Sequence, residues 1–219
     1  MNLYRLDASI RLEGSVTRAV ADSAESGWHS RNPGGSVVRR ELGLDPLPAR
    51  TWIDAVGAMV NSGPLTPAQE EAVALVSRLV DEILGADALL LAIPMYNFGV
   101  PHHVKAWVDA IMTDPRLRPV GGQPLAGKPA ILILARSGGY AEGTSRFGWD
   151  HNTPWLRRIF ADALGLDLHV TEVELTLAHV NPAMKALRDQ ADQTLDNGHA
   201  LARSQGVKLA EQLLELAVA

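Results

Sequence analysis

Hydroxyl side chains gather in the segment ASIRLEGSVTRAV near the N-terminus. Ser9 follows an apolar run, and Gly14, Ser15 and Thr17 stand where a helix is expected to begin. The first turn of a helix offers free N–H groups and the positive end of the helix dipole, so this segment suits a phosphate monoester. It lacks lysine and the G-x-x-x-x-G-K-[ST] pattern, which argues against a nucleoside triphosphate. The alternative, that Ser15 is only a helix N-cap, fits equally well.

A second group of residues that could bind a ligand is PMYNFG, which follows the apolar run ALLLAI. Tyr96 and Phe98 provide flat apolar surface, and the amide of Asn97 both donates and accepts hydrogen bonds. Gly99 permits a positive φ or a close approach of the backbone. Such a loop can lie along an aromatic ring system and bind its polar edge. The alternative is a packed loop that only covers the end of a sheet.

The third group lies in ARSGGYAEGTSRFGWDHNTPW, directly after the apolar run PAILILA. Ser137, Gly138 and Gly139 allow the backbone to pass close to a ligand. Loops of this length inside a compact domain are usually functional, although a disordered surface loop is the alternative.

Alternating strand and helix patterns separate these three loops. Strands are expected at residues 3–8, 36–41, 88–93, 129–135 and 168–177, and helices at 15–28, 67–84, 102–112, 153–164 and 182–217. The 67–84 helix carries the clearest signals, with Thr66 as N-cap, Gln69 completing a capping box and Gly85 as the stop. This alternation predicts an α/β fold, a doubly wound five-stranded parallel sheet of order 2-1-3-4-5 with helices on both faces. Ligands bind such sheets beyond the carboxyl ends of the strands, where the three loops should meet.

Composition sets broad limits on the protein class. The chain has 219 residues, of which 47% are hydrophobic, a net charge of −5 and no cysteine. A negative net charge does not favour binding to nucleic acid. No apolar stretch approaches the roughly 20 residues that span a membrane. We therefore expect a single soluble, cytoplasmic domain over residues 1–219, without disulfides and without membrane or nucleic-acid partners.

Two other chemistries are disfavoured by spacing. His102 and His103 are adjacent, so on a helix they point about 100° apart and cannot chelate one ion well, and neither H-x-x-x-H nor H-E-x-x-H occurs. We therefore expect no metal site. Ser137 lacks the G-x-S-x-G frame of a hydrolase nucleophile.

The three loops together resemble those of the FMN-dependent NADH azoreductase and quinone reductase family, over most of residues 1–177. The likeness is clearest in PLTPAQEEAVALVSRLVDEILGADALLLAIPMYNFGVPHHVKAWVDAI, and TPWLRRIFADALGL also fits. The resemblance implies a flavodoxin-like fold, FMN as cofactor and NADH or NADPH as electron donor. It also implies a small aromatic or quinonoid acceptor, with azo compounds as the other substrate class, and ping-pong hydride transfer in a homodimer.

The resemblance also implies roles for individual residues. The FMN phosphate would be held by Ser9, Ser15, Val16 and Thr17. The isoalloxazine would be lined by Met95, Tyr96, Asn97 and Phe98, and Pro94 is counted with these cofactor-binding residues. Its far edge would be closed by Arg136, Ser137, Gly138 and Gly139. A likeness of the loop after PAILILA to mammalian-type quinone reductases names Tyr140 and His151 as catalytic contacts to the acceptor.

One segment departs from the family pattern. The family usually has Gly-x-Thr-Phe after the helix that follows the PMYNFG loop, whereas this chain has MTDPRLRPVGGQPLAG over residues 112–127. A different substrate pocket is therefore expected.

Two alternative functions stay open, a flavodoxin-like electron carrier and a flavin-free binding protein on the same fold. Extra length at residues 50–66, in the loop after PAILILA and in the C-terminal helix favours an enzyme with a substrate cavity. The helix HVKAWVDAIM is the expected dimer contact.

Overall fold

The computed structural model describes residues 1–118, 120 and 122–218. Pro119 and Gly121 of the divergent 112–127 segment, and Ala219, lie outside the described residues. The strands are β1 (Asn2–Asp7), β2 (Ser36–Glu41), β3 (Ala88–Pro94), β4 (Pro129–Ala135) and β5 (Asp167–Val173). The helices are α1 (Val16–Arg31), α2 (Thr51–Val60), α3 (Pro67–Leu84), α4 (His102–Ile111), α5 (Thr153–Arg157) and α6 (Arg188–Val218). A π-helical stretch (Arg158–Ala163) extends α5, and a 3₁₀ stretch (Pro182–Leu187) precedes α6.

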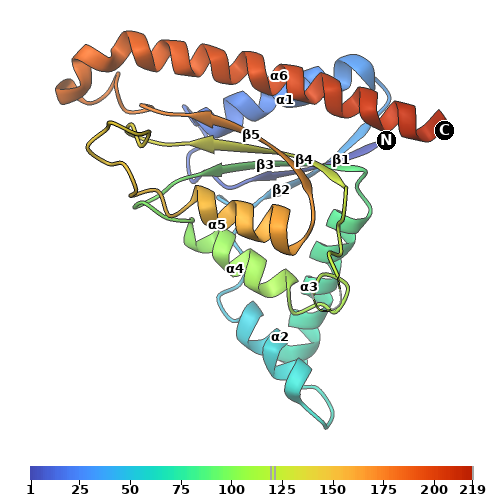
Figure 1. Cartoon of the computed structure of the whole chain (residues 1–219). Helices are drawn as coiled ribbons and strands as arrows, with labels where there is room; N and C mark the ends of the chain where they lie inside the picture. The colour runs from blue at the N-terminus through green and yellow to red at the C-terminus, as the bar shows by residue number, and fades with distance from the viewer. Residues whose placement is uncertain (119, 121, 219) are drawn as a thin grey trace.

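The strands form one parallel sheet in the order β2-β1-β3-β4-β5, which confirms the predicted topology. β1 lies between β2 and β3, with Leu3 opposite both Val37 and Ala88. The order therefore reverses at β1 and β3, and the carboxyl ends of all strands lie on one edge (Figure 1).

Helices cover both faces of the sheet, as predicted. α1 and α6 lie together on one face, while α3, α4 and α5 cover the other and α2 projects beyond them (Figure 1). The two faces have separate cores, one built around Trp28 of α1 and Leu209 of α6, the other around Trp107 of α4 and Phe160. Every residue of β3 and β4 is buried, because these central strands are covered on both sides.

A charged residue lies within the first strand. Arg5 is only 3% exposed, and its guanidinium donates to Asp7 (2.8 Å), Asp22 (2.6 Å) and Glu25 (2.9 Å). Burial lowers the pKa of this guanidinium, but the hydrogen bonds and charges of the three carboxylates raise it by more, so the side chain stays charged. β1 therefore tolerates a charge that would be costly without partners.

The helix signals at 67–84 are confirmed at both ends. Thr66 and Gln69 form a reciprocal capping box, and Gly85 is the C-cap of α3. The predicted bounds of the strands at 36–41 and 129–135 are also confirmed, as β2 and β4, whereas other predicted boundaries were wrong. The helix α2 was not foreseen in the 50–66 segment, and β5 stops at Val173 rather than continuing to residue 177. The strand ends there because Leu175 has φ +61°, outside the β region.

Of the helices in the described part of the chain, none is both long and apolar enough to cross a membrane.

Candidate functional site

A cleft of about 810 Å³ lies at the carboxyl edge of the sheet, beside the reversal in strand order. It collects nine of the residues predicted from sequence, namely Ser9, Ser15, Val16, Thr17, Pro94, Met95, Tyr96, Asn97 and Ser137. The start of α4 and the segment after β5 complete its wall. Among the described residues that line the cleft, the other predicted ones are absent, namely Phe98, Arg136, Gly138, Gly139, Tyr140 and His151.

The N-terminus of α1 forms one end of the cleft. Ser15 is the N-cap, and its hydroxyl accepts from the backbone N–H of Arg18 (3.4 Å) and lies 3.3 Å from Thr17 Oγ1. The N-cap prediction is therefore confirmed. The first turn of α1, Val16 to Ala19, contains no acidic residue. Since the first N–H groups of a helix have no partner within it, this end of the cleft suits an anion.

Arg18 holds the preceding loop in place. Its guanidinium donates to the carbonyl oxygens of Ser9 (3.0 Å) and Arg11 (3.2 Å) and to Glu41 Oε2 (2.6 Å). The side chain is thus engaged in bracing the loop between β1 and α1.

The loop after β3 is a tight turn in which Phe98 has a backbone conformation that is unusual for a bulky residue. Tyr96 and Gly99 exchange backbone hydrogen bonds of 3.1 and 3.0 Å, and the two residues between them have positive φ, +48° at Asn97 and +67° at Phe98. Positive φ at both central positions is the signature of a type I′ turn, which favours Asn followed by Gly. The positive φ therefore falls on Asn97 and Phe98 rather than on Gly99.

Two hydrogen bonds join this turn and α4 to the end of β1. The backbone N–H of Ile10 donates to the hydroxyl of Tyr96 (3.1 Å), and His103 Nε2 lies 2.8 Å from the carbonyl oxygen of Ala8. Because a carbonyl only accepts, Nε2 of His103 carries the proton. Burial lowers the pKa of His103, and its bond to Ala8 acts in the opposite direction with a smaller effect, so the neutral imidazole is favoured.

Arg136 anchors the loop after β4. Its guanidinium pairs with Asp150 (2.5 Å), Glu174 (3.2 Å) and Glu172. Asp150 in turn accepts from the backbone N–H of Thr153 (2.9 Å), the first residue of α5. Burial raises the pKa of Asp150, but the hydrogen bonds from Thr153 and Arg136 lower it by more. The Arg136 side chain therefore ties the loop to β5 and α5 at the margin of the cleft.

Tyr140 belongs to an aromatic cluster on this loop. The ring of Phe98 meets Tyr140 edge to face at 6.5 Å and Trp149 at 5.4 Å. The guanidinium of Arg146 lies 5.9 Å from the centre of the Phe98 ring and donates weakly to the Tyr140 hydroxyl (3.4 Å). This cluster packs the loop after β3 against the loop after β4.

His151 makes its contact through the backbone. Its N–H donates to the carbonyl oxygen of Phe98 (2.9 Å), while its side chain is exposed. The start of α5 is capped by the carboxylate of Asp150, which accepts from the N–H and the hydroxyl of Thr153, and not by His151.

The sequence did not point to several residues that line the cleft, among them Arg11, His102, His103, Thr176 and Leu177. The two histidines were considered only as metal ligands. Among the described residues, no group of three or more His, Asp or Glu side chains is placed to hold a metal ion. Thr176 and Leu177 were assigned to β5. The sequence could have indicated these two residues. β5 is parallel to β4, so the residues after its carboxyl end lie at the same ligand-binding edge of the sheet.

The cleft and the strand order agree with the comparison to known families. The sequence model of Flavodoxin_2, described as a flavodoxin-like fold, matches residues 1–197. The chain belongs to this family. Flavodoxin_2 membership confirms the fold expected from the resemblance and accounts for the position of the cleft at the reversal of strand order.

Two similar proteins in this comparison are named FMN-dependent NADH:quinone oxidoreductase. The protein from Frankia alni is 35% identical over 93% of this chain and 97% of its own length. The protein from Kineococcus radiotolerans is 36% identical over 92% of this chain and 96% of its own length. Among solved structures, the FMN-dependent NADH-azoreductase from Bacillus anthracis str. Ames Ancestor in complex with FMN has a TM-score of 0.77. It is 18% identical, over 96% of this chain and all of that chain, and shows the shared fold.

Proposed function

We propose that this protein is an FMN-dependent oxidoreductase that passes a hydride from NADH or NADPH to a quinone. The observation that carries the proposal is the cleft itself, which has an anion-binding helix end on one side and a turn of flat side chains on the other. The names of relatives that are 35–36% identical favour NADH and quinones. The likeness to azoreductases is one of fold, so azo compounds are the second choice of acceptor.

The residues present fit FMN. A volume of about 810 Å³ lies within the usual range of small-molecule sites. The phosphate would meet the free N–H groups of Val16 and Thr17 with the hydroxyls of Ser9 and Ser15. The ring system would lie beside Pro94, Met95, Tyr96 and Asn97, with Phe98 next to them, and its far edge near Arg136, Ser137, Gly138 and Gly139. In this proposal residues 1–219 form one FMN-binding domain.

The protein's own contribution is binding and positioning. Bound FMN supplies the hydride chemistry, and the polypeptide determines which molecules reach it. The bonds of Tyr96 to Ile10 and of His103 to Ala8 hold the two walls of the cleft at a set distance. We propose that donor and acceptor contact FMN in turn within this cleft, which is the ping-pong order.

Tyr140 and His151 are proposed as hydrogen-bond donors to the acceptor oxygen. Both lie on the loop after β4, and Tyr140 packs against Phe98 at the cleft margin. The long loop with its glycines would have to shift for these side chains to reach a substrate. We also propose that the protein works in the cytoplasm as a homodimer.

The anion end of the cleft allows a direct test of the FMN assignment. Ser15→Asp retains a good N-cap, because Asp caps helices as well as Ser does, but places a carboxylate opposite the phosphate. Loss of a charge-assisted contact costs about 1.5–3 kcal/mol, so FMN affinity should fall roughly tenfold to hundredfold.

Ser15→Asn is the matched control, since it has the same shape and capping ability without the charge. Equilibrium titration of both apoproteins with FMN, followed by flavin fluorescence, gives the two affinities. Equal FMN affinity in Ser15→Asp and wild type would refute the phosphate site. Wild-type protein that binds FMN tightly but does not oxidise NADH in the presence of any quinone would refute the enzymatic proposal.

A further inference from the structure

A second cavity of about 410 Å³ lies next to the cleft. Its walls are the segment from Pro46 to Trp52, which leads into α2, and the first turns of α4 at His102, His103 and Ala106. We call it the α2–α4 pocket. His102 and His103 line both the cleft and this pocket, so the two spaces adjoin at the start of α4.

The lining of the α2–α4 pocket is apolar. Six of its residues are Pro46, Leu47, Pro48, Ala49, Trp52 and Ala106. Among the described residues that line it, none is Lys, Arg, Asp or Glu. A diphosphate or a carboxylate would find no countercharge there, so the pocket does not suit the phosphates of a dinucleotide.

The pocket is held in shape before any ligand arrives. Pro46 and Pro48 restrict the backbone, and the N–H of Thr51 donates to the carbonyl of Pro48 (2.9 Å). On the other side His103 is tied to the carbonyl of Ala8 (2.8 Å). Because the wall is already ordered, little conformational entropy is lost when a ligand binds, which favours affinity for an apolar group.

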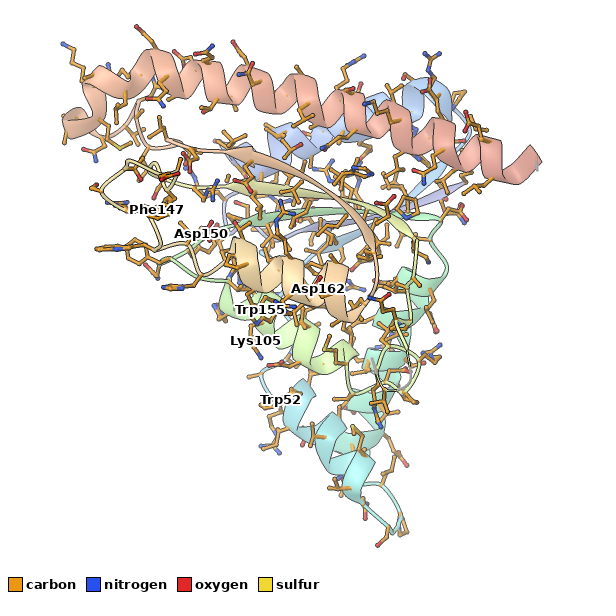
Figure 2. All side chains as sticks on the ribbon, in the orientation of Figure 1. Trp52, Lys105, Phe147, Asp150, Trp155 and Asp162 are labelled. Atoms are coloured by element: carbon orange, nitrogen blue, oxygen red, sulfur yellow. The ribbon has the colours of Figure 1, made fainter. Side chains whose placement is uncertain are left out.

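Trp52 presents apolar surface at the edge of this pocket. Its side chain is 52% exposed although it is a large aromatic residue. Figure 2 shows Trp52 on α2 on the same side of the molecule as Lys105 on α4. The ring thus adds apolar surface to the wall of the pocket.

We propose that the α2–α4 pocket binds the apolar side chain of the quinone acceptor, such as a prenyl or alkyl chain. This inference rests on the proposed function, because the quinone ring would occupy the cleft while its side chain passes His102 into the pocket. The preferred acceptor is then a lipid-type quinone rather than a bare ring. His102 lies where the ring and the chain meet.

The test compares two naphthoquinones, one with a methyl group only and one that also carries a short prenyl chain, with the FMN-loaded protein. The measured quantity is the ratio of kcat/KM for the prenylated quinone to kcat/KM for the methyl quinone. Ala106→Phe fills the pocket from the exposed side of α4 and should lower this ratio about tenfold or more, the scale of discrimination in apolar pockets. Trp52→Ala removes one wall and should lower the ratio in the same direction.

Ala74→Phe is the matched control, since Ala74 is an exposed helical residue on α3 outside both cavities, and its ratio should equal that of wild type. An unchanged ratio in Ala106→Phe overturns the pocket assignment while quinone reduction stands. A variant that turns a dimer into a monomer and slows both quinones equally also overturns it, because the pocket is then a subunit contact. If wild-type protein reduces neither quinone, the proposed function fails and the pocket assignment fails with it.

Discussion

Phe98 occupies a backbone conformation that usually belongs to glycine. At φ +67° an L-residue brings its Cβ close to the carbonyl oxygen that follows, at a cost of roughly 1–2 kcal/mol. The edge-to-face contacts of Phe98 with Tyr140 and Trp149 are worth about 0.5–1.5 kcal/mol each. Packing at the margin of the cleft therefore offsets the strain, and strain of this kind gathers at functional sites.

We predict that Phe98→Gly is more stable than Phe98→Ala by about 1 kcal/mol. Both changes remove the same ring contacts, but only glycine is relaxed at this φ. At positions with negative φ an alanine variant is usually more stable than a glycine variant. A more stable glycine variant here therefore identifies the left-handed conformation. Urea unfolding of the two variants measures it, and an alanine variant that is as stable as the glycine variant would contradict the left-handed turn.

The proposed roles of Tyr140 and His151 make a separate prediction. Tyr140→Phe and His151→Ala should slow re-oxidation of the reduced enzyme by quinone, because each loses a donor to the acceptor oxygen. Reduction by NADH should stay within about threefold of the wild-type rate, since that step needs no such donor. Stopped-flow absorbance follows the two half-reactions separately. If both variants are re-oxidised by quinone at the wild-type rate, the loop after β4 only covers the site and takes no part in quinone reduction.

At the scale of elements, α1 and α6 cross in close contact. A Cβ at Gly206 of α6 would lie 1.9 Å from the carbonyl oxygen of Ala24, and a Cβ at Gly27 of α1 would lie 2.2 Å from that of Arg203. The two helices therefore meet backbone to backbone. This crossing positions α1, whose N-terminus forms one end of the cleft.

We predict that Gly206→Ala destabilises the protein by about 1–3 kcal/mol, because the added methyl group meets rigid backbone. Helix propensity alone would predict a gain of about 1 kcal/mol. Gly57→Ala in α2 is the control, since its nearest neighbour is a side-chain atom, Nε2 of Gln69 at 3.0 Å, which can turn aside while Oε1 of Gln69 keeps its capping bond to Thr66. Stability there should be unchanged or slightly raised. Thermal unfolding of both variants tests the difference in sign. Similar changes at the two positions would argue against the tight crossing.

At the scale of the whole molecule, the surface bears on assembly. The helix predicted to form the dimer contact turns Val104, Trp107 and Val108 into the protein's own core, so these side chains are not free for a partner. α2 instead exposes apolar side chains, with Ile53 at 59% and Val60 at 78% exposure. An exposed apolar helix face of this kind is typical of an interaction surface.

We predict that the protein is a dimer at micromolar concentration and that Ile53→Lys with Val60→Lys makes it a monomer. Charges on this face would be buried without partners in the dimer. Leu201→Lys on α6, on the opposite face of the sheet, is the control and should remain a dimer. Size-exclusion chromatography with light scattering measures the mass. A wild-type monomer that retains FMN would contradict the proposed assembly.

Local patterns in the sequence determined most of the fold. Apolar runs of six residues (88–93) and seven residues (129–135) marked the central parallel strands β3 and β4, and Thr66 with Gln69 marked the start of α3, because periodicity and capping depend on neighbours along the chain. The strand order followed from general rules of connection. The same reasoning gathered Ser15 and Asn97 into one site before any coordinates were known.

Only the tertiary structure decided which contacts and cavities form between segments that are far apart in the sequence. Nothing near Phe98 in the sequence indicates a positive φ, since contacts with Tyr140 and Trp149 compensate for it. Likewise, His102 and His103 line two cavities only because the Pro46–Trp52 segment folds against α4. Such features depend on pairs of residues far apart in the chain, whose contact energies have no counterpart in local periodicity.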